Sequence, residues 1–160
     1  VNAICAMPHK QLIVLDMIDS RLELAKQIGA DVVLNPGKED ALAECMRLTG
    51  QIGCDVYIEA TGHPSAVQQG LDMLRKGGSL EFSVMSGTST IDWSIIGDAK
   101  ELTIRGSQLS PYCYPKVIQA IQDKKLKIDK IVSHKFRLED WEEAYRVAQT
   151  REALKVVFVF

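Results

Sequence analysis

The stretch LIVLDMIDSRLELAKQIGADVVL, residues 12–34, shows the strand–helix–strand pattern that decides the fold. Leu12 to Leu15 form a continuous apolar run, which is typical of a strand buried on both faces. The segment from Ser20 to Ile28 has apolar residues at helical spacing, and Val32 to Leu34 predict a second strand. Because strands joined through a helix run parallel, this stretch predicts one unit of a parallel α/β sheet.

The ends of this first predicted helix carry their own signals. Asp19 or Ser20 can cap its N-terminus, because a side-chain oxygen accepts a hydrogen bond from the first unpaired N–H groups. Gly29 can end it, because glycine adopts the backbone conformation that follows a helix. We therefore expect a helix over residues 20–28.

The same alternation continues to the end of the chain and predicts an α/β fold. Further strands are predicted at 55–59, 80–84, 102–105 and 156–160, and a further helix at 40–48. A helix with Val67, Leu71 and Leu74 on one face is expected to end at Gly77-Gly78. In two later helices the residues expected to point inward are Val117, Ile118 and Ile121, and then Trp141, Ala144, Tyr145 and Ala148.

Composition indicates one ordinary domain, or one domain plus part of a second. The 160 residues are 46% hydrophobic and 25% charged, which is enough apolar material for a core. The 19 basic and 21 acidic residues give a net charge of −2, so we expect neither a nucleic-acid nor a membrane partner. A small-molecule ligand is the better expectation.

The cysteines and the chain start indicate the cellular setting. Cys5, Cys45, Cys54 and Cys113 lie far apart without a C-x-x-C pair, which favours reduced thiols in a cytoplasmic protein. No apolar run approaches the roughly 18 residues of a membrane span, and no basic flank marks a signal peptide. Because the first residue is Val1, we expect a chain that was processed or cut from a longer protein.

Asp16 is the residue whose position says most about function. It closes an apolar strand directly before a turn and a helix. In dinucleotide-binding sheets, an acid at this place accepts hydrogen bonds from the adenosine ribose and repels a 2′-phosphate, which selects NAD over NADP. The alternative is a solvated acid at a strand end. Arg21 could lie along the adenosine, or could be an ordinary surface residue of the helix.

Two further turns follow predicted parallel strands, at the sheet edge where open α/β folds bind ligands. Glu59-Ala60-Thr61-Gly62 follows the third strand, and its glycine would let the backbone approach a ligand. Ser83-Val84-Met85-Ser86-Gly87 follows the fourth. Either turn could equally be an ordinary strand-to-helix connection.

A metal site is not expected in this chain. None of the histidines, His9, His63 and His134, is spaced from a cysteine or carboxylate as zinc requires. The sequence also has neither a G-x-S-x-G elbow nor a phosphate-binding P-loop.

Taken together, these motifs resemble the medium-chain, zinc-dependent alcohol and polyol dehydrogenases over nearly the whole chain. The stretches that show the resemblance are 12–31, 54–62, 74–78, 92–102, 106–115 and 131–134. The last three look like the branch that oxidises polyols such as erythritol or threitol, with threonine and sorbitol dehydrogenases as cousins.

The resemblance implies an NAD site. Asp16 would bind the adenosine ribose, and Arg21 would lie on the outer side of the same nucleoside. Ala60 and Thr61, with Gly62 in the turn, would line the adenine and ribose side of the cleft.

The nicotinamide end is also implied by the resemblance. Main-chain groups near Ser83, Ser107 and Leu109 would hold the carboxamide. Val84 would line the same side, although the family often has glycine at that position.

The resemblance further implies that part of the fold is missing. We expect a Rossmann-type doubly wound parallel sheet, incomplete at its N-terminus, without the first strand and its Gly-rich loop. Val1 to Met7 would be the tail of the first helix. In the order 3-2-1-4-5-6, the strands at 12–16 and 56–59 would then each lose a neighbour. Residues 1–109 would be a partial NAD-binding domain, and residues 110–160 would pack on an absent catalytic domain.

The implied function is the cofactor-binding portion of an NAD-dependent oxidoreductase that transfers hydride between a polyol or secondary alcohol and NAD. Zinc ligands and catalytic residues would lie upstream, so the isolated chain would be inactive and bind NAD weakly. The parent would be a homodimer or homotetramer, paired through the edge strand at 102–105. The alternative is a non-catalytic α/β fragment acting in oligomerisation or scaffolding.

Overall fold

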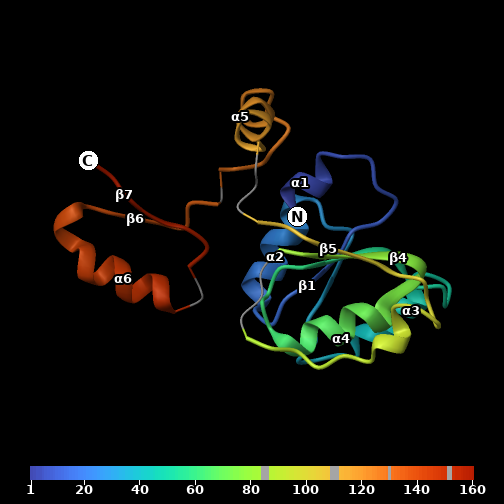
Figure 1. Cartoon of the computed structure of the whole chain (residues 1–160). Helices are drawn as coiled ribbons and strands as arrows, with labels where there is room; N and C mark the ends of the chain where they lie inside the picture. The colour runs from blue at the N-terminus through green and yellow to red at the C-terminus, as the bar shows by residue number, and fades with distance from the viewer. Residues whose placement is uncertain (84–86, 109–111, 130, 151–152) are drawn as a thin grey trace. The chain divides into compact units, whose positions relative to one another are not determined.

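Helices and parallel strands alternate along the computed structural model, which describes residues 1–83, 87–108, 112–129, 131–150 and 153–160 (Figure 1). The helices are α1 (Asn2–Cys5), α2 (Asp19–Ile28), α3 (Ala41–Leu48), α4 (Pro64–Met73), α5 (Tyr114–Gln122) and α6 (Trp141–Gln149), with short 3-10 turns at Trp93–Ile95 and Leu138–Asp140. The strands are β1 (Ile13–Leu15), β2 (Val32–Leu34), β3 (Cys54–Glu59), β4 (Leu74–Phe82), β5 (Thr103–Gly106), β6 (His134–Phe136) and β7 (Val156–Phe158). None of these described helices combines the length and apolar character needed to cross a bilayer.

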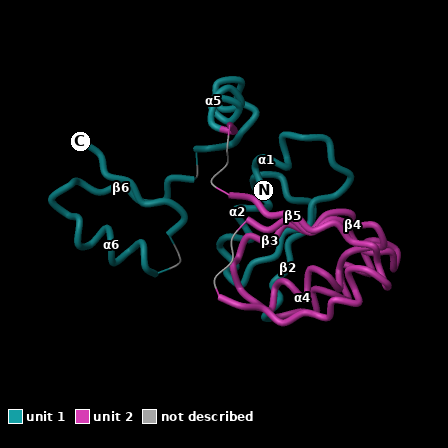
Figure 2. The backbone as a smooth tube through the Cα atoms, viewed as in Figure 1, with its two compact units in different colours: residues 1–37, 114–160 teal, residues 38–113 magenta. Residues whose placement is uncertain are grey.

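The chain divides into two compact units (Figure 2). One unit consists of Val1–Gly37 together with Tyr114–Phe160, and the other of Lys38–Cys113. The strand orders are β1-β2 in the first unit and β3-β4-β5 in the second. In the predicted order 3-2-1-4-5-6, β1 and β2 are strands 2 and 3, and β3, β4 and β5 are strands 4, 5 and 6, so both observed orders agree with it. In the described residues β1 and β3 each have one hydrogen-bonded neighbour, as expected for a Rossmann-type sheet without its first strand.

In the first unit, β1 and β2 pair in parallel with Leu15 opposite Leu34. Helix α2 connects them and buries Leu22 and Ala25. The predicted cap of this helix is wrong, because Ile18 is the N-cap residue and makes no side-chain cap hydrogen bond.

The predicted end of α2 is confirmed. Gly29 follows the helix with φ +135°, and its N–H donates to carbonyls of the last turn. Such a φ favours glycine, because a side chain would be strained there.

The C-terminal part of the first unit contains a strand that the sequence did not predict. β6 pairs in parallel with β7, His134 lying opposite Val156, and α6 connects the two strands. The strand begins at His134, after the apolar pair Ile131-Val132.

The expected inward faces of α5 and α6 are mostly wrong for this chain, and only Ala144 among the residues expected to point inward is buried. Val117 and Ile118 are 46% and 54% exposed, and α5 has no buried residue among those described. Trp141 and Tyr145 of α6 are also mostly exposed, Ala148 is exposed, and Ala144 is buried. The helical apolar periodicity is real, but in the described chain these faces remain open to solvent.

In the second unit, β3, β4 and β5 pair in parallel around a core of Val67, Leu71, Leu74 and Leu80. The predicted helix end at Gly77-Gly78 is wrong. α4 ends at Met73, and both glycines lie inside β4. A side chain at Gly78 would come within 2.9 Å of the Arg75 carbonyl in β4 and 3.3 Å of the Asp55 carbonyl in β3, so this glycine permits the close approach of the two strands.

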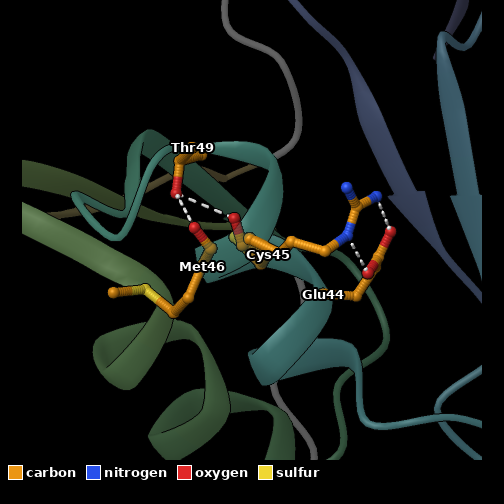
Figure 3. A network of polar contacts seen from close by, with 5 residues as sticks. Glu44, Cys45, Met46 and Thr49 are labelled. Atoms are coloured by element: carbon orange, nitrogen blue, oxygen red, sulfur yellow. Dashed lines mark hydrogen bonds and ion pairs between the residues drawn. The ribbon is translucent and has the colours of Figure 1, made fainter.

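Helix α3 corresponds to the predicted helix at 40–48, and the Asp40 side chain caps its N-terminus by accepting the Ala43 N–H at 3.0 Å. Its other end is held by the Thr49 hydroxyl, which donates to the Cys45 carbonyl at 2.8 Å (Figure 3). The same hydroxyl oxygen accepts the Gly53 N–H at 3.0 Å. The Thr49 side chain thus joins the helix end to the residue before β3.

Candidate functional site

Asp16 lies where β1 ends, at the carboxyl edge of the β1-β2 pair. Its Oδ1 accepts the Ile18 N–H at 2.9 Å, which fixes the turn into α2. Its Oδ2 lies 4.0 Å from the Arg21 guanidinium, and both side chains are about a third exposed. One carboxylate oxygen therefore builds the turn, while the other faces Arg21 at a partly accessible position.

Asn35 lies beside this turn and was not singled out from the sequence as a site residue. It follows β2 as Asp16 follows β1, and it is 6% exposed. Its side-chain amide donates to the Met17 carbonyl and to the Asp19 carboxylate. The available signal was Asn35-Pro36-Gly37 directly after a strand, which also marks an ordinary turn.

The turn after β3 is organised by Glu59, which begins the motif Glu59-Ala60-Thr61-Gly62 but is not among the predicted cofactor-binding residues. Glu59 is 1% exposed, and its Oε1 accepts the Thr61 N–H at 2.8 Å and the Thr61 hydroxyl. Both its oxygens also lie within hydrogen-bond distance of the Gly62 N–H, at 3.1 and 3.2 Å. A buried carboxylate needs such donors, so Glu59 is satisfied by the turn that it shapes.

Gly62 is required in this turn. It is buried and has φ +74°, a conformation that an amino acid with a side chain adopts only with strain. The adjacent Ala60 and Thr61 are exposed. Inside the same unit, burial and then the negative charge of Glu59 raise the pKa of Tyr57 to about 12, and the neighbouring thiols add to the shift.

The structure brings two further predicted residues to the same edge of the three-stranded sheet. Phe82 of β4 lies opposite Glu59 and Gly106, so Ser83 and Ser107 follow their strands side by side with the Glu59 turn. Both serines are exposed. The Ser83 N–H donates to the Glu59 carbonyl, and the Ser107 N–H and hydroxyl donate to the Phe82 carbonyl. The other two predicted residues, Val84 and Leu109, lie outside the described residues.

Among the described residues, no group of three or more histidine, cysteine, aspartate or glutamate side chains could hold a metal ion. The histidines have local contacts instead. His9 lies 3.7 Å from Asp31, and His63 caps α4 by accepting the Ser65 N–H. His134 stacks on Phe136.

Comparison with known proteins identifies dehydrogenases as relatives of this chain. The family model described as "Zinc-binding dehydrogenase" matches residues 3–123. The erythritol/L-threitol dehydrogenase of Mycolicibacterium smegmatis is 44% identical over 151 residues, which is 93% of this chain and 42% of that protein. The L-threonine 3-dehydrogenase of Pyrococcus horikoshii is 37% identical over 92% of this chain and 44% of its own length.

A solved structure agrees with these relatives. It is a short chain alcohol dehydrogenase from E. coli CFT073 in complex with the cofactor NADH, and it superposes with a TM-score of 0.89 at 27% sequence identity. The match covers 99% of this chain and 48% of that one. The chain thus spans about half the length of the relatives that it matches.

Proposed function

This chain belongs to the zinc-binding dehydrogenase family, and we propose that it forms the NAD-binding portion of a polyol or secondary-alcohol dehydrogenase. We refer to that longer protein as the parent enzyme. The M. smegmatis relative, named for erythritol and L-threitol, supports a polyol substrate class.

The observation that carries this proposal is the position of Asp16. Its carboxylate ends a parallel strand, is partly accessible, and is held by the Ile18 N–H. In the parent enzyme it accepts hydrogen bonds from the adenosine ribose hydroxyls, and its charge repels the 2′-phosphate of NADP. Arg21, whose guanidinium lies 4.0 Å from the second carboxylate oxygen, lies beside the same nucleoside.

The second unit supplies the remaining contacts that we assign to this chain. Ala60, Thr61 and Gly62 line the adenine and ribose side, in a turn that Glu59 holds. Main-chain groups near Ser83, Val84, Ser107 and Leu109 bind the nicotinamide carboxamide. We place residues 1–109 in the NAD-binding domain and residues 110–160 in a segment that packs on the catalytic domain.

The described residues do not fit a zinc site, so we assign the zinc ligands and the substrate pocket to the remainder of the parent enzyme. When bound, NAD accepts the hydride. The residues of this chain bind and orient the cofactor. By itself the chain is inactive and binds NAD weakly, because its sequence has no G-x-G-x-x-G loop to hold the pyrophosphate. We assign the parent enzyme to the cytoplasm.

Replacing Asp16 with serine in the parent enzyme tests the proposal. The ratio of kcat/KM with NAD to kcat/KM with NADP, measured with erythritol or threitol, should fall at least about tenfold. The reason is that a charge-assisted hydrogen bond of about 1.5–3 kcal/mol is lost and the repulsion of NADP is removed.

Asp31→Ser is the matched control. Asp31 lies before β2, and its carboxylate accepts the Leu12 N–H at 2.7 Å, at the opposite end of the same strand pair. This control should leave the coenzyme ratio unchanged. An unchanged ratio in Asp16→Ser would show that Asp16 is only a solvated acid at a strand end.

A further inference from the structure

Asn35 is a buried polar residue, and it is not among the residues that we assign to cofactor binding. It follows β2 directly, and Pro36 restricts its backbone to the extended region, so it continues the line of the strand. Burial of an amide is costly unless it is hydrogen-bonded. The hydrogen bonds of the Asn35 side chain therefore indicate its structural role.

Three hydrogen bonds of the Asn35 side chain lie in the two turns at the carboxyl edge of the β1-β2 pair. The amide nitrogen donates to the Met17 carbonyl at 3.2 Å and to the Asp19 carboxylate at 2.8 Å. The amide oxygen accepts the Gly37 N–H at 3.0 Å. Asn35 thus joins the turn that contains Asp16 to the turn that follows β2.

The fit around Asn35 is close. A side chain at Gly37 would come within 2.8 Å of the Met17 methyl carbon and 3.2 Å of the Asn35 amide oxygen. The backbone adds a contact of its own, since the Asp16 N–H donates to the Leu34 carbonyl at 3.3 Å. The residues on both sides of Asp16 are therefore held from β2 and the turn after it.

We propose that Asn35 is a positioning residue for coenzyme selection: it holds residues 17–19 so that the Asp16 carboxylate faces the adenosine ribose. This inference rests on the proposed function of Asp16. Asn35 does not touch the cofactor and acts through the turn. Loosening the turn should weaken NAD binding and relax the exclusion of NADP, while the hydride transfer step remains intact.

Asn35→Asp is the sharpest variant, because it keeps size and shape. It retains an oxygen to accept the Gly37 N–H but replaces the donor with a second oxygen, which faces the Met17 carbonyl and the Asp19 carboxylate. Like charges then repel across the contact with Asp19. A second substitution, Asp19→Asn, returns a donor to this contact from the other side.

The experiment uses steady-state kinetics of the parent enzyme with NAD and NADP, and thermal melting of each variant. In Asn35→Asp, the KM for NAD should rise about tenfold with little change in kcat, and the NAD-to-NADP ratio of kcat/KM should fall. The double variant Asn35→Asp with Asp19→Asn should recover part of that ratio. If Asn35→Asp does not fold, the double variant alone decides: a ratio below that of the wild type supports the proposal, and an unchanged ratio overturns it.

Asn2→Asp is the matched control. The Asn2 amide nitrogen donates to the Lys127 carbonyl, and the amide oxygen accepts the Lys127 N–H, both at 3.0 Å and away from Asp16. It should lower the melting temperature, because the Asn2 amide no longer donates to the Lys127 carbonyl, and leave the coenzyme ratio unchanged. Suppose that Asn35→Asp folds and keeps the wild-type coenzyme ratio, while Asp16→Ser changes that ratio. This result overturns the role proposed for Asn35 and leaves the role proposed for Asp16 in place. If neither variant changes the ratio, the cofactor assignment itself is wrong.

Discussion

Asp16 illustrates how one residue can serve the fold and the ligand at once. Its Oδ1 is used by the Ile18 N–H, whereas its Oδ2 has a long contact with Arg21. A salt bridge at 4.0 Å between partly exposed groups contributes little to stability. The orientation of this carboxylate therefore depends more on its turn than on Arg21.

Glu59 lies at the end of β3 in the second unit, as Asp16 lies at the end of β1 in the first, but Glu59 is fully buried. Glu59→Gln in the parent enzyme keeps the side-chain shape but changes one oxygen into an NH2 donor, which faces the Gly62 N–H in either position of the amide. We expect a loss of about 1–3 kcal/mol in unfolding free energy, because a buried donor is left without its acceptor. The KM for NAD should rise as well.

Urea unfolding and NAD kinetics of this variant check both effects. Glu23→Gln, an exposed position on α2, is the control and should change neither quantity. Wild-type stability in Glu59→Gln would mean that the turn does not depend on the charge of Glu59.

At the scale of elements, the end of α4 depends on a residue far away in the sequence. The ammonium group of Lys100 donates to the carbonyls of Leu71, Asp72 and Leu74 at 2.7–2.8 Å. A cation at a helix C-terminus satisfies unpaired carbonyls and interacts favourably with the helix dipole. This contact explains why α4 ends at Met73, before Gly77-Gly78.

Lys100→Met in the parent enzyme should therefore destabilise the second unit by about 2 kcal/mol, since hydrogen bonds to a charged group are lost at a partly buried site. Thermal or urea unfolding measures this loss. Lys76→Met, at an exposed position in β4, is the matched control. Equal stability of the two variants would show that Lys100 does not hold the helix end.

The sequence predicted which elements form better than where they end. The strand–helix–strand unit of residues 12–34 follows from apolar periodicity, which is a local signal. The end of α4 and the N-terminus of α2 depend on Lys100 and Asn35, which are distant in sequence. For the same reason Asp16 and the turn Glu59-Ala60-Thr61-Gly62 were found from motifs, whereas the buried contacts of Asn35 and Glu59 became visible only in the structure.

The apolar faces of α5 and α6 show the same limit for whole helices. Helical spacing correctly predicted both helices, but burial depends on a partner for the face. In the described residues, Ile118 and Tyr145 remain 54% and 63% exposed.

At the scale of the whole molecule, β5 is the edge of its three-stranded sheet in the described residues. All its residues are exposed, and Ile104 is 37% exposed. An unprotected edge offers unpaired backbone groups to a second chain. We propose that the parent enzyme forms a homodimer or homotetramer through this edge, an isologous contact between two copies of β5.

Ile104→Lys should weaken this association, because two lysines would meet near the two-fold axis. Light scattering of the folded parent enzyme should then report a smaller species. Ile52→Lys, at an exposed apolar position between α3 and β3, should leave the oligomer intact. An unchanged oligomer in Ile104→Lys would remove this part of β5 from the interface.

The distance between the Asp16 carboxylate and the adenosine ribose, in a crystal structure of the parent enzyme with NADH, tests the central claim most directly. We predict that an Asp16 oxygen lies about 2.6–3.2 Å from the ribose hydroxyls, as a hydrogen bond requires. A ribose bound elsewhere, with Asp16 facing solvent, would contradict the assignment of this chain to the adenosine side of the NAD site.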